Sequence, residues 1–249
     1  MIIGHLTRDL RNLKACSLTC RSWYTAAVPH LHHTLTLVGG KPDPDHSQLK
    51  PLSKLHELGL MPFVKEVRVD RWPGTCRWFM PLTFSRLDLH NFSALANVHT
   101  LKLRDIEIYH FIPNIKLHFG HLSQTLRSIT LYDPRCTPRQ LSHFLSLFSN
   151  LDDVGIRGTR KYIFNTPIPD AAVPDTKLIQ FSAPKLRGRL VLYSSPWIAT
   201  WTCLASYGGL RFRHMDLRGS TYCAPVLFKA CANSLETLRF NVADTVRGK

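Results

Sequence analysis

Two cysteines and a nearby group of histidines are the residues of this chain that most resemble a set of metal ligands. Cys16 and Cys20 lie four positions apart, and His30 and His32 follow within twelve residues. Thiolates and imidazoles are good zinc ligands, but the spacing of this set is not that of a zinc finger. The two cysteines also fall one helical turn apart in an apolar pattern, which suits core packing. We therefore expect no metal site.

The sequence offers no convincing catalytic centre. It lacks the glycine-rich nucleotide-binding motifs, the His-Glu-x-x-His zinc motif and the Gly-x-Ser-x-Gly nucleophile motif. The adjacent carboxylates Asp152 and Asp153 would point to opposite faces of a strand, so they cannot share a substrate there. His30, His32 and His33 lie at an expected helix-to-strand junction with no carboxylate nearby in sequence. We expect a protein that is not an enzyme and that uses no cofactor.

Composition favours a globular protein with a strongly basic surface. The 249 residues are 44% hydrophobic and 20% charged, which argues against disorder. The formal net charge is +15, and the basic residues are spread along the chain instead of forming a tail or a run. Nucleic-acid binders more often concentrate charge on one stripe, so we expect no nucleic-acid partner, although a basic nucleic-acid-associated protein remains a third reading. Acidic partners are plausible.

The cysteines and one long uncharged segment bear on the cellular compartment. The seven cysteines are odd in number and irregularly spaced, and Met1–Leu10 lacks the pattern of a secretory signal. Reduced thiols in the cytoplasm or nucleus are therefore expected. Leu190–Leu210 carries no charge and is long enough to span a bilayer, but it contains serines, threonines, a proline and two glycines. We expect no membrane partner.

A repeated strand pattern organises most of the chain. The motif apolar-x-x-apolar-x-apolar, with two looser copies, recurs every 23 to 36 residues, and its final apolar-x-apolar step has the period of a strand. The last apolar residues of the eight copies are Leu37, Val69, Leu103, Leu131, Ile156, Leu192, Leu217 and Phe240.

Helical patterns lie between several of these strands. The clearest is Thr137–Phe148, which starts like a capping box and carries apolar residues at positions i, i+3, i+4 and i+7. Further stripes run from Leu49 to Leu58 and from Cys223 to Cys231. Alternating strands and helices predict parallel crossovers, in either a doubly wound sheet or an open solenoid. Because the strands alternate apolar and polar residues, we favour an irregular α/β solenoid like that of leucine-rich repeats.

The strand register predicts a recognition face. If the apolar residues face the helices, then the residues between and after them face the open side of the sheet. One column on that side combines planar guanidinium groups with phenol rings, and we expect it to bind an acidic or phosphorylated segment of a partner protein. The alternative is a solvated charged face. The column consists of Arg104, Tyr132, Arg157, Tyr193 and Arg218.

The N-terminal segment resembles a known family. The stretch from Leu13 to Trp23, which ends in Cys-Arg-Ser-Trp, is similar to the second helix of an F-box. The chain as a whole resembles fungal F-box proteins with irregular leucine-rich-like repeats. The family usually begins with Leu-Pro and a fuller first helix, of which only a part corresponds to the segment after Met1. The likeness predicts a partial F-box-like helical segment over 1–38 and a leucine-rich-repeat-like domain over 47–249.

What the resemblance implies is selection of substrates for a Skp–cullin–F-box ubiquitin ligase. The F-box segment would dock on the Skp adaptor, and the repeat face would hold a protein substrate of unknown identity. The alternative is a non-catalytic scaffold or binding protein of the same architecture without ligase association. Cys20 and Trp23 are expected to pack inside the helical motif. By resemblance the adaptor-facing residues are Ile3, Leu6, Leu10, Leu13 and Leu18.

Overall fold

The protein is an α/β protein built around one parallel sheet. The computed structural model describes residues 9–38, 50–70, 93–106, 108, 120–134, 136, 138–158, 186–193, 205, 210–218 and 224–241. Each of the eight strands pairs in parallel with its neighbours in chain order. The strands are β1 (Thr34–Val38), β2 (Glu66–Asp70), β3 (Thr100–Arg104), β4 (Ser128–Tyr132), β5 (Asp153–Arg157), β6 (Arg189–Tyr193), β7 (His214–Arg218) and β8 (Thr237–Asn241).

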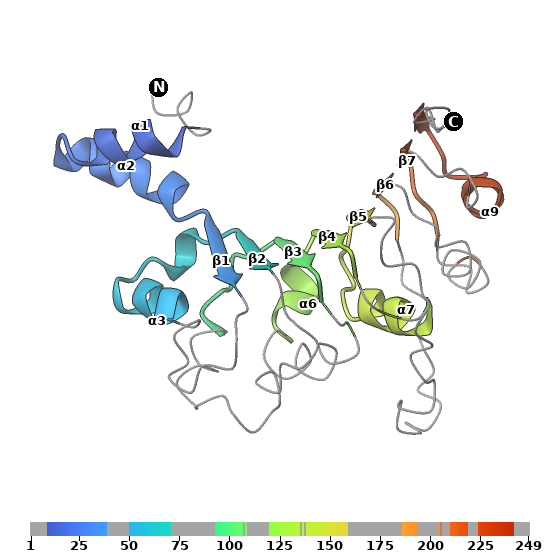
Figure 1. Cartoon of the computed structure of the whole chain (residues 1–249), viewed down its shortest axis with the longest axis horizontal. Coiled ribbons are helices and arrows are strands. Elements are labelled where there is room, and N and C mark those ends of the chain that lie inside the picture. Colours follow the sequence, from blue (N-terminus) through green and yellow to red (C-terminus); the bar gives the residue numbers. More distant parts are fainter. Residues whose placement is uncertain are drawn as a thin grey trace, which may run out of the picture.

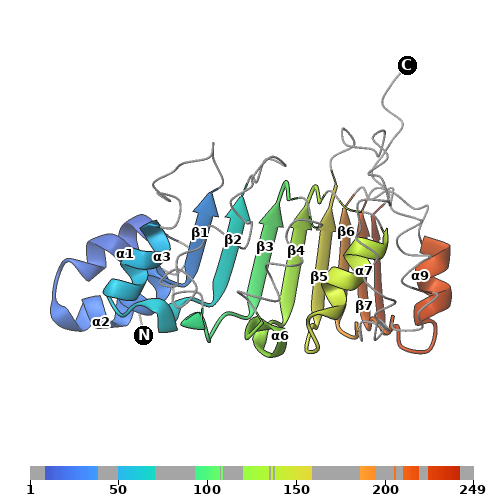
Figure 2. The same cartoon turned by 90° about the horizontal axis from the view of Figure 1, so that it is seen from below.

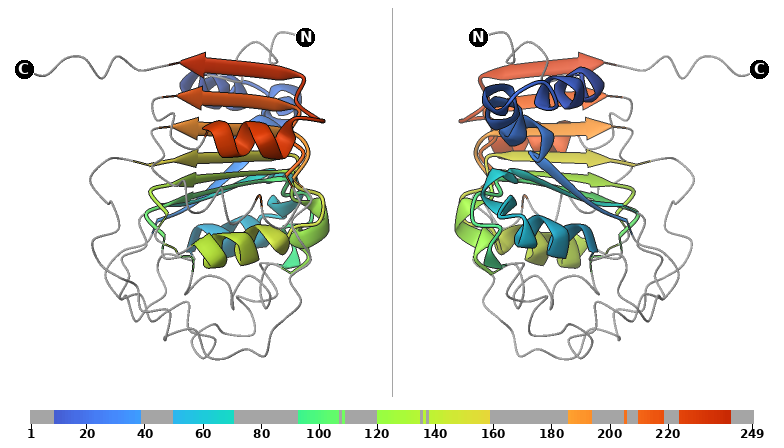
Figure 3. Two further views of the ribbon diagram at one scale, coloured as in Figure 1. Left: turned by 90° about the vertical axis from the view of Figure 1, so that its right-hand side faces the viewer. Right: turned by 90° about the vertical axis from the view of Figure 1, so that its left-hand side faces the viewer.

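The sheet follows an arc, and helices lie along its outer side (Figure 1). The views in Figures 2 and 3 agree that the strands run side by side in chain order, with helices against one face. The opposite, inner face carries no helix within the described part of the chain. The helices of the outer side are α3 (Lys50–Glu57), α6 (Leu122–Thr125), α7 (Pro138–Ser146) and α9 (Ala224–Cys231), with a 3-10 turn, η3 (Met61–Phe63), between α3 and β2.

The predicted strand register is confirmed at every step of the sheet. The eight final apolar residues of the repeat pair with one another across successive strands, from Leu37 beside Val69 to Leu217 beside Phe240. Together with the apolar residues two positions earlier, they form one continuous core with the helices. Only β8 departs, because Leu238 and Phe240 are 44% and 45% exposed at the end of the sheet.

A recurring backbone junction sets the start of each strand. In most units one carbonyl oxygen accepts two consecutive N–H groups from the next unit, as that of His33 does from Lys65 and Glu66 at 2.9 and 3.0 Å. The same arrangement recurs at His99 and at Arg127. Because the junction uses backbone groups alone, it holds the units in register while the intervening lengths vary.

Polar side chains support some of these turns. Asn97 donates a hydrogen bond from its side-chain amide to the Pro62 carbonyl oxygen at 2.8 Å, and Asn150 donates to that of Gln124 at 2.8 Å. Ser234 donates to the Phe212 carbonyl oxygen at 3.2 Å. The sequence pattern shows no regular asparagine ladder, but these three side chains bridge neighbouring units in the manner of one.

The junction before β6 requires a glycine. The N–H of Arg189 donates to the carbonyl oxygen of Asp152 at 2.8 Å, which brings Gly188 against that oxygen. A Cβ at position 188 would overlap the oxygen, so only glycine fits here. The Gly188 carbonyl oxygen in turn accepts the N–H groups of Arg213 and His214.

The predicted helices form, with one correction. In α7 and the turn after it, Leu141, Phe144, Leu145 and Phe148 are all buried in the core, as their spacing predicts. The expected stripe from Leu49 to Leu58 is wrong at its end. α3 ends at Glu57, and Gly59 follows with a φ of 66°, so Leu58 is 58% exposed and Leu60 turns into the core instead.

The N-terminal segment forms two helices where the sequence predicts a single one. α1 (Leu10–Ser17) begins at Asp9, whose carboxylate accepts the N–H groups of Arg11 and Asn12, and α2 (Arg21–Leu31) leads into β1. The break between them at Leu18–Cys20 overturns the expectation that Cys16 and Cys20 lie a turn apart on one helix. The two helices enclose a small cluster of their own, separate from the main core.

Candidate functional site

The open face of the sheet carries the predicted column of arginines and tyrosines in register. Arg104 pairs with Tyr132 across β3 and β4, Tyr132 with Arg157, Arg157 with Tyr193, and Tyr193 with Arg218. We call these five residues the Arg–Tyr ladder. The sheet therefore brings together side chains that lie up to 114 positions apart in the chain.

Each guanidinium of the ladder stacks on a neighbouring phenol ring. The Arg104 guanidinium carbon lies 5.2 Å from the Tyr132 ring centroid, and that of Arg157 lies 5.2 Å from the same ring and 4.1 Å from the Tyr193 ring. The Arg218 guanidinium carbon lies 4.9 Å from the Tyr193 ring centroid. Such cation–π contacts are worth about 0.5–1 kcal/mol at exposed sites. They hold the guanidinium planes in place, which sequence reasoning about the column did not anticipate.

The three ladder arginines are not equivalent. Arg218 donates two hydrogen bonds to Asp216, from Nε at 2.9 Å and from Nη2 at 2.6 Å. The Arg218 guanidinium lowers the pKa of Asp216, a carboxyl group that the sheet otherwise buries. In contrast, no carboxylate of the described residues lies within ion-pair distance of Arg104 or Arg157. The charges of these two arginines are therefore available to a partner, whereas that of Arg218 is neutralised.

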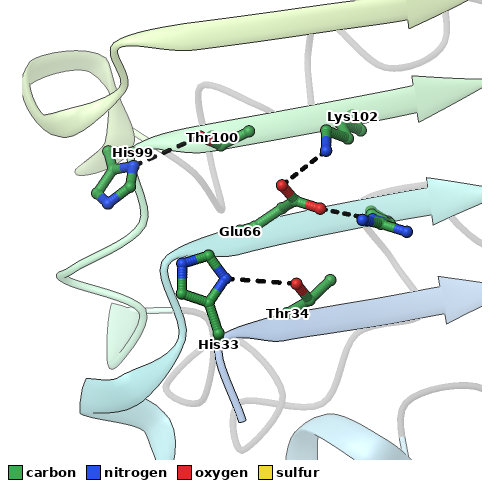
Figure 4. Close-up of polar contacts among 7 residues, drawn as sticks. His33, Thr34, Glu66, His99, Thr100 and Lys102 are labelled. Atoms are coloured by element: carbon green, nitrogen blue, oxygen red, sulfur yellow. Dashed lines mark hydrogen bonds and ion pairs between the residues drawn. The ribbon is translucent and has the colours of Figure 1, made fainter. Parts of the chain in front are cut away.

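A second paired carboxylate lies near the first strands. Glu66 accepts a hydrogen bond from Arg68 at 2.5 Å and faces the Lys102 ammonium at 2.7 Å (Figure 4). Burial alone would raise the pKa of Glu66, but the bonds from Lys102 and Arg68 outweigh it, so the pKa is lowered. Figure 4 also shows His33 beside Thr34 and His99 beside Thr100, a matching pair at the start of two strands.

A hollow of about 230 Å³ opens in the centre of the face, where Gly155 has no side chain. Gly155 lies between Thr130 and Val191 in the register. Because it has no side chain, the surface of the sheet is lower there than at these two neighbouring residues. Arg157, Arg189 and Tyr193 line the hollow on strands β5 and β6. It is also lined by Ser128, Thr130, Asp153, Val154 and Val191.

The electrostatics of the hollow are mixed but positive. Arg157 and Arg189 both border it, and Arg189 also lies 3.8 Å from the Asp216 carboxylate. Asp153 borders it as well, and burial raises the pKa of that carboxyl group. An anionic group in the hollow would therefore bind best near Arg157, away from Asp153, which lies four residues earlier on the same strand.

The residues predicted to face an adaptor divide into three groups. Ile3 and Leu6 lie outside the described residues. Leu10 and Leu18 are 54% and 86% exposed, so they are accessible. The prediction that Leu13 faces an adaptor is wrong. Its side chain is fully buried in the cluster with Ala27 and cannot contact a partner without unfolding of the two helices.

Two other side chains of the N-terminal helices also differ from expectation. Cys20 is exposed at the start of α2, and Trp23 is 38% exposed, although both were expected to pack inside the motif. Tyr24 beside them is 50% exposed. The break between α1 and α2 turns these side chains outward, so the helical pair presents more apolar surface than the pattern of one helix predicts.

The described part of the chain holds no other group that suggests chemistry. Within it, no three His, Cys, Asp or Glu residues gather closely enough to hold a metal ion. None of the helices in that part is both long and apolar enough to cross a membrane, and residues 190–193 of the long uncharged segment lie in β6. The sequence matches no model of a known protein family and no curated protein.

Proposed function

We propose that this chain is the substrate-recognition subunit of a Skp–cullin–F-box ubiquitin ligase. In this proposal the N-terminal helices are an F-box-like segment that docks on the Skp adaptor. The sheet is the inner surface of an irregular leucine-rich-repeat-like solenoid that holds a partner protein on the Arg–Tyr ladder. The chain itself performs no chemistry.

The ladder is the observation that carries the proposal of partner binding. Its rings and guanidinium groups form a continuous strip across five strands, and two of its arginines have no carboxylate partner among the described residues. A protein partner with acidic side chains would supply the missing counter-charges. The repeat of eight strands in chain order, with α3, α6, α7 and α9 along the outer side of the arc, supports the solenoid assignment.

The exposed apolar side chains of the helical pair support the docking role. Leu10, Leu18, Trp23 and Tyr24 leave a large fraction of their area in water, although they belong to a segment with a core of its own. Large apolar side chains on short helices are typical anchors in helix-mediated association. The likeness of this segment to an F-box names the Skp adaptor as the partner.

A pull-down of the full chain with purified Skp adaptor tests the proposal. The Leu18→Asp and Leu10→Asp variants should lose capture, because each places a charge in the docking surface. Leu58→Asp is the matched control, since Leu58 is 58% exposed at the end of α3, outside the N-terminal helical pair, and should leave capture unchanged. Capture that survives both N-terminal changes, or no capture at all, contradicts the ligase role.

The alternative is a binding protein of the same architecture that does not engage the ligase. Burial of Leu13 in the small cluster suits a helical cap on the first strand, because α2 leads directly into β1. In that case the chain would bind its partner on the ladder and show no capture by the adaptor.

A further inference from the structure

We infer that the partner segment crosses the strands of the open face as an extended polyproline-type chain with an acidic side chain at every third position. The inference rests on the proposed role of the open face and specifies the ligand for which its arginines are spaced. It follows from the period of the Arg–Tyr ladder, from the state of each arginine and from the hollow at Gly155.

The first step is the spacing of the arginines. They occupy alternate strands, with Arg104 on β3, Arg157 on β5 and Arg218 on β7. Neighbouring strands lie about 4.8 Å apart, so successive ladder arginines originate about 9.6 Å apart. The arc of the sheet is concave on this side, which brings the side-chain ends slightly closer than their origins (Figure 1).

The second step compares this period with those of possible ligands. A polyproline II helix has three residues per turn and a rise of about 3.1 Å, so every third side chain lies on one face at intervals of about 9.3 Å. A β-strand places same-face side chains at about 6.6 Å, and its third residue, near 10 Å, points the other way. An α-helix repeats a face after seven residues, at about 10.5 Å. The polyproline spacing matches a concave ladder best.

The third step concerns how the arginines present themselves. Arg157 lies over two rings and Arg104 over one, so the faces of their guanidinium groups are occupied while both side chains remain exposed. Nη2 of Arg157 donates a hydrogen bond to the Tyr193 hydroxyl at 3.3 Å, and the other N–H groups of the two guanidinium edges are left for a ligand. A guanidinium edge fits the two oxygens of a carboxylate or phosphate. Stacking reduces the rotamer freedom that binding would otherwise remove.

The fourth step places the centre of the ligand. The hollow above Gly155 adjoins Arg157. Arg189 also lines it, but this residue pairs with Asp153 in the register and lies 3.8 Å from the Asp216 carboxylate. An anionic side chain over Arg157 therefore meets a guanidinium that has no carboxylate partner among the described residues, and one over Arg104 meets a second such group. The third anionic side chain would face Arg218, which Asp216 already neutralises, so it should contribute least.

Peptides of equal composition test the inference by fluorescence anisotropy with the full chain. One carries three glutamates separated by pairs of prolines, and the other carries the three glutamates in a block flanked by the same prolines. The spaced peptide should bind at least about tenfold more tightly. Equal binding would overturn the inference, because attraction to a chain of net charge +15 does not depend on spacing.

Variants locate the binding on the ladder. Arg157→Gln should weaken binding of the spaced peptide about tenfold, and adding Arg104→Gln should reduce it to the level of the block peptide. Arg213→Gln is the matched control, because Arg213 is exposed and lies before β7, outside the ladder, and it should change the affinity less than twofold. Ladder variants that bind the spaced peptide like the wild type contradict the inference.

Two further arms separate the sources of the anionic group and the class of ligand. Replacing the middle glutamate by phosphoserine should preserve or strengthen binding if the hollow takes a phosphate, and tighter binding of the unmodified peptide identifies a carboxylate. A single-stranded polynucleotide that displaces the spaced peptide at equal charge concentration would overturn the acidic-segment assignment. None of these arms involves the Skp adaptor, so failure here is distinct from failure of the ligase role.

Discussion

The glycine that precedes β6 gives the sharpest test of how the units are joined. In the Gly188→Ala variant the new Cβ would overlap the carbonyl oxygen of Asp152, which accepts the Arg189 N–H at 2.8 Å. Either the hydrogen bond is lost or the β5–β6 junction moves. Overpacking of this kind costs about 1–3 kcal/mol and a lost hydrogen bond about 1 kcal/mol. The free energy of unfolding should therefore fall by about 2–4 kcal/mol.

Urea denaturation followed by circular dichroism measures this loss, and hydrogen exchange locates it. Protection should fall first at the amides of β5 and β6, since the junction holds these two strands together. Gly155→Ala is the matched control, because the atoms nearest to its Cβ would belong to the Thr130 side chain, the first at 3.2 Å, and not to backbone. The expected change is within about 1 kcal/mol. If Gly188→Ala were as stable as the wild type, the account of the junction would be wrong.

Three further predictions follow from burial and pairing. Leu13→Ala should destabilise the N-terminal helical pair by about 2–4 kcal/mol, because the side chain is fully buried, and limited proteolysis should then cleave within that pair. The Asp216–Arg218 pair should make stability depend on pH. The pKa of Asp216 is lower in the folded state than in the unfolded state. Its contribution to the free energy of unfolding is therefore complete above the unfolded-state pKa of about 3.9, and it is lost as the pH falls through the folded-state pKa. An Asp216→Asn variant should lack that decline in acid denaturation. The Cys136 thiol should resist alkylation in the folded protein while Cys20 reacts, because burial raises the pKa of Cys136, and mass spectrometry after iodoacetamide treatment would detect the difference.

The sheet could be predicted from the sequence because its signal is purely periodic. Two apolar residues on one face of each strand, preceded three positions earlier by another, define both the strand and its register. The final residues of all eight copies, such as Leu103 and Leu131, pair as predicted. The Arg–Tyr ladder followed from the same register, since residues after the apolar ones must share a face and a row.

The state of the ladder residues was harder to predict. The predicted row compares residues on neighbouring strands. It therefore does not include the pairing of Arg218 with Asp216, which lies two positions earlier on the same strand and face. The same signal, opposite charges at i and i+2, also applies to Glu66 and Arg68. The hollow forms because Gly155 has no side chain. A pattern of charged and aromatic residues does not predict such a hollow.

The prediction of one helix in the N-terminal segment is wrong because the helical spacing of its apolar residues continues across a turn. The spacing of Leu13, Cys16, Cys20 and Trp23 fits one continuous helix, but the chain breaks at Leu18–Cys20. Asp9 caps the N-terminus of α1, a second helix begins at Arg21, and the two helices pack against each other. Propensity within so short a stretch is weak, and packing of the two helices on each other decides the outcome.

Strand pairing in chain order has a consequence for how the polypeptide reaches its native state. Each of the eight described strands pairs with the strands next to it in the chain, so a unit that leaves the ribosome can dock on the unit before it without waiting for a distant partner. Loop closure between successive units spans only tens of residues, which keeps its entropic penalty small. Folding can then proceed in the direction of synthesis, with the newest strand always presenting a free edge. That edge is the template on which the following strand assembles.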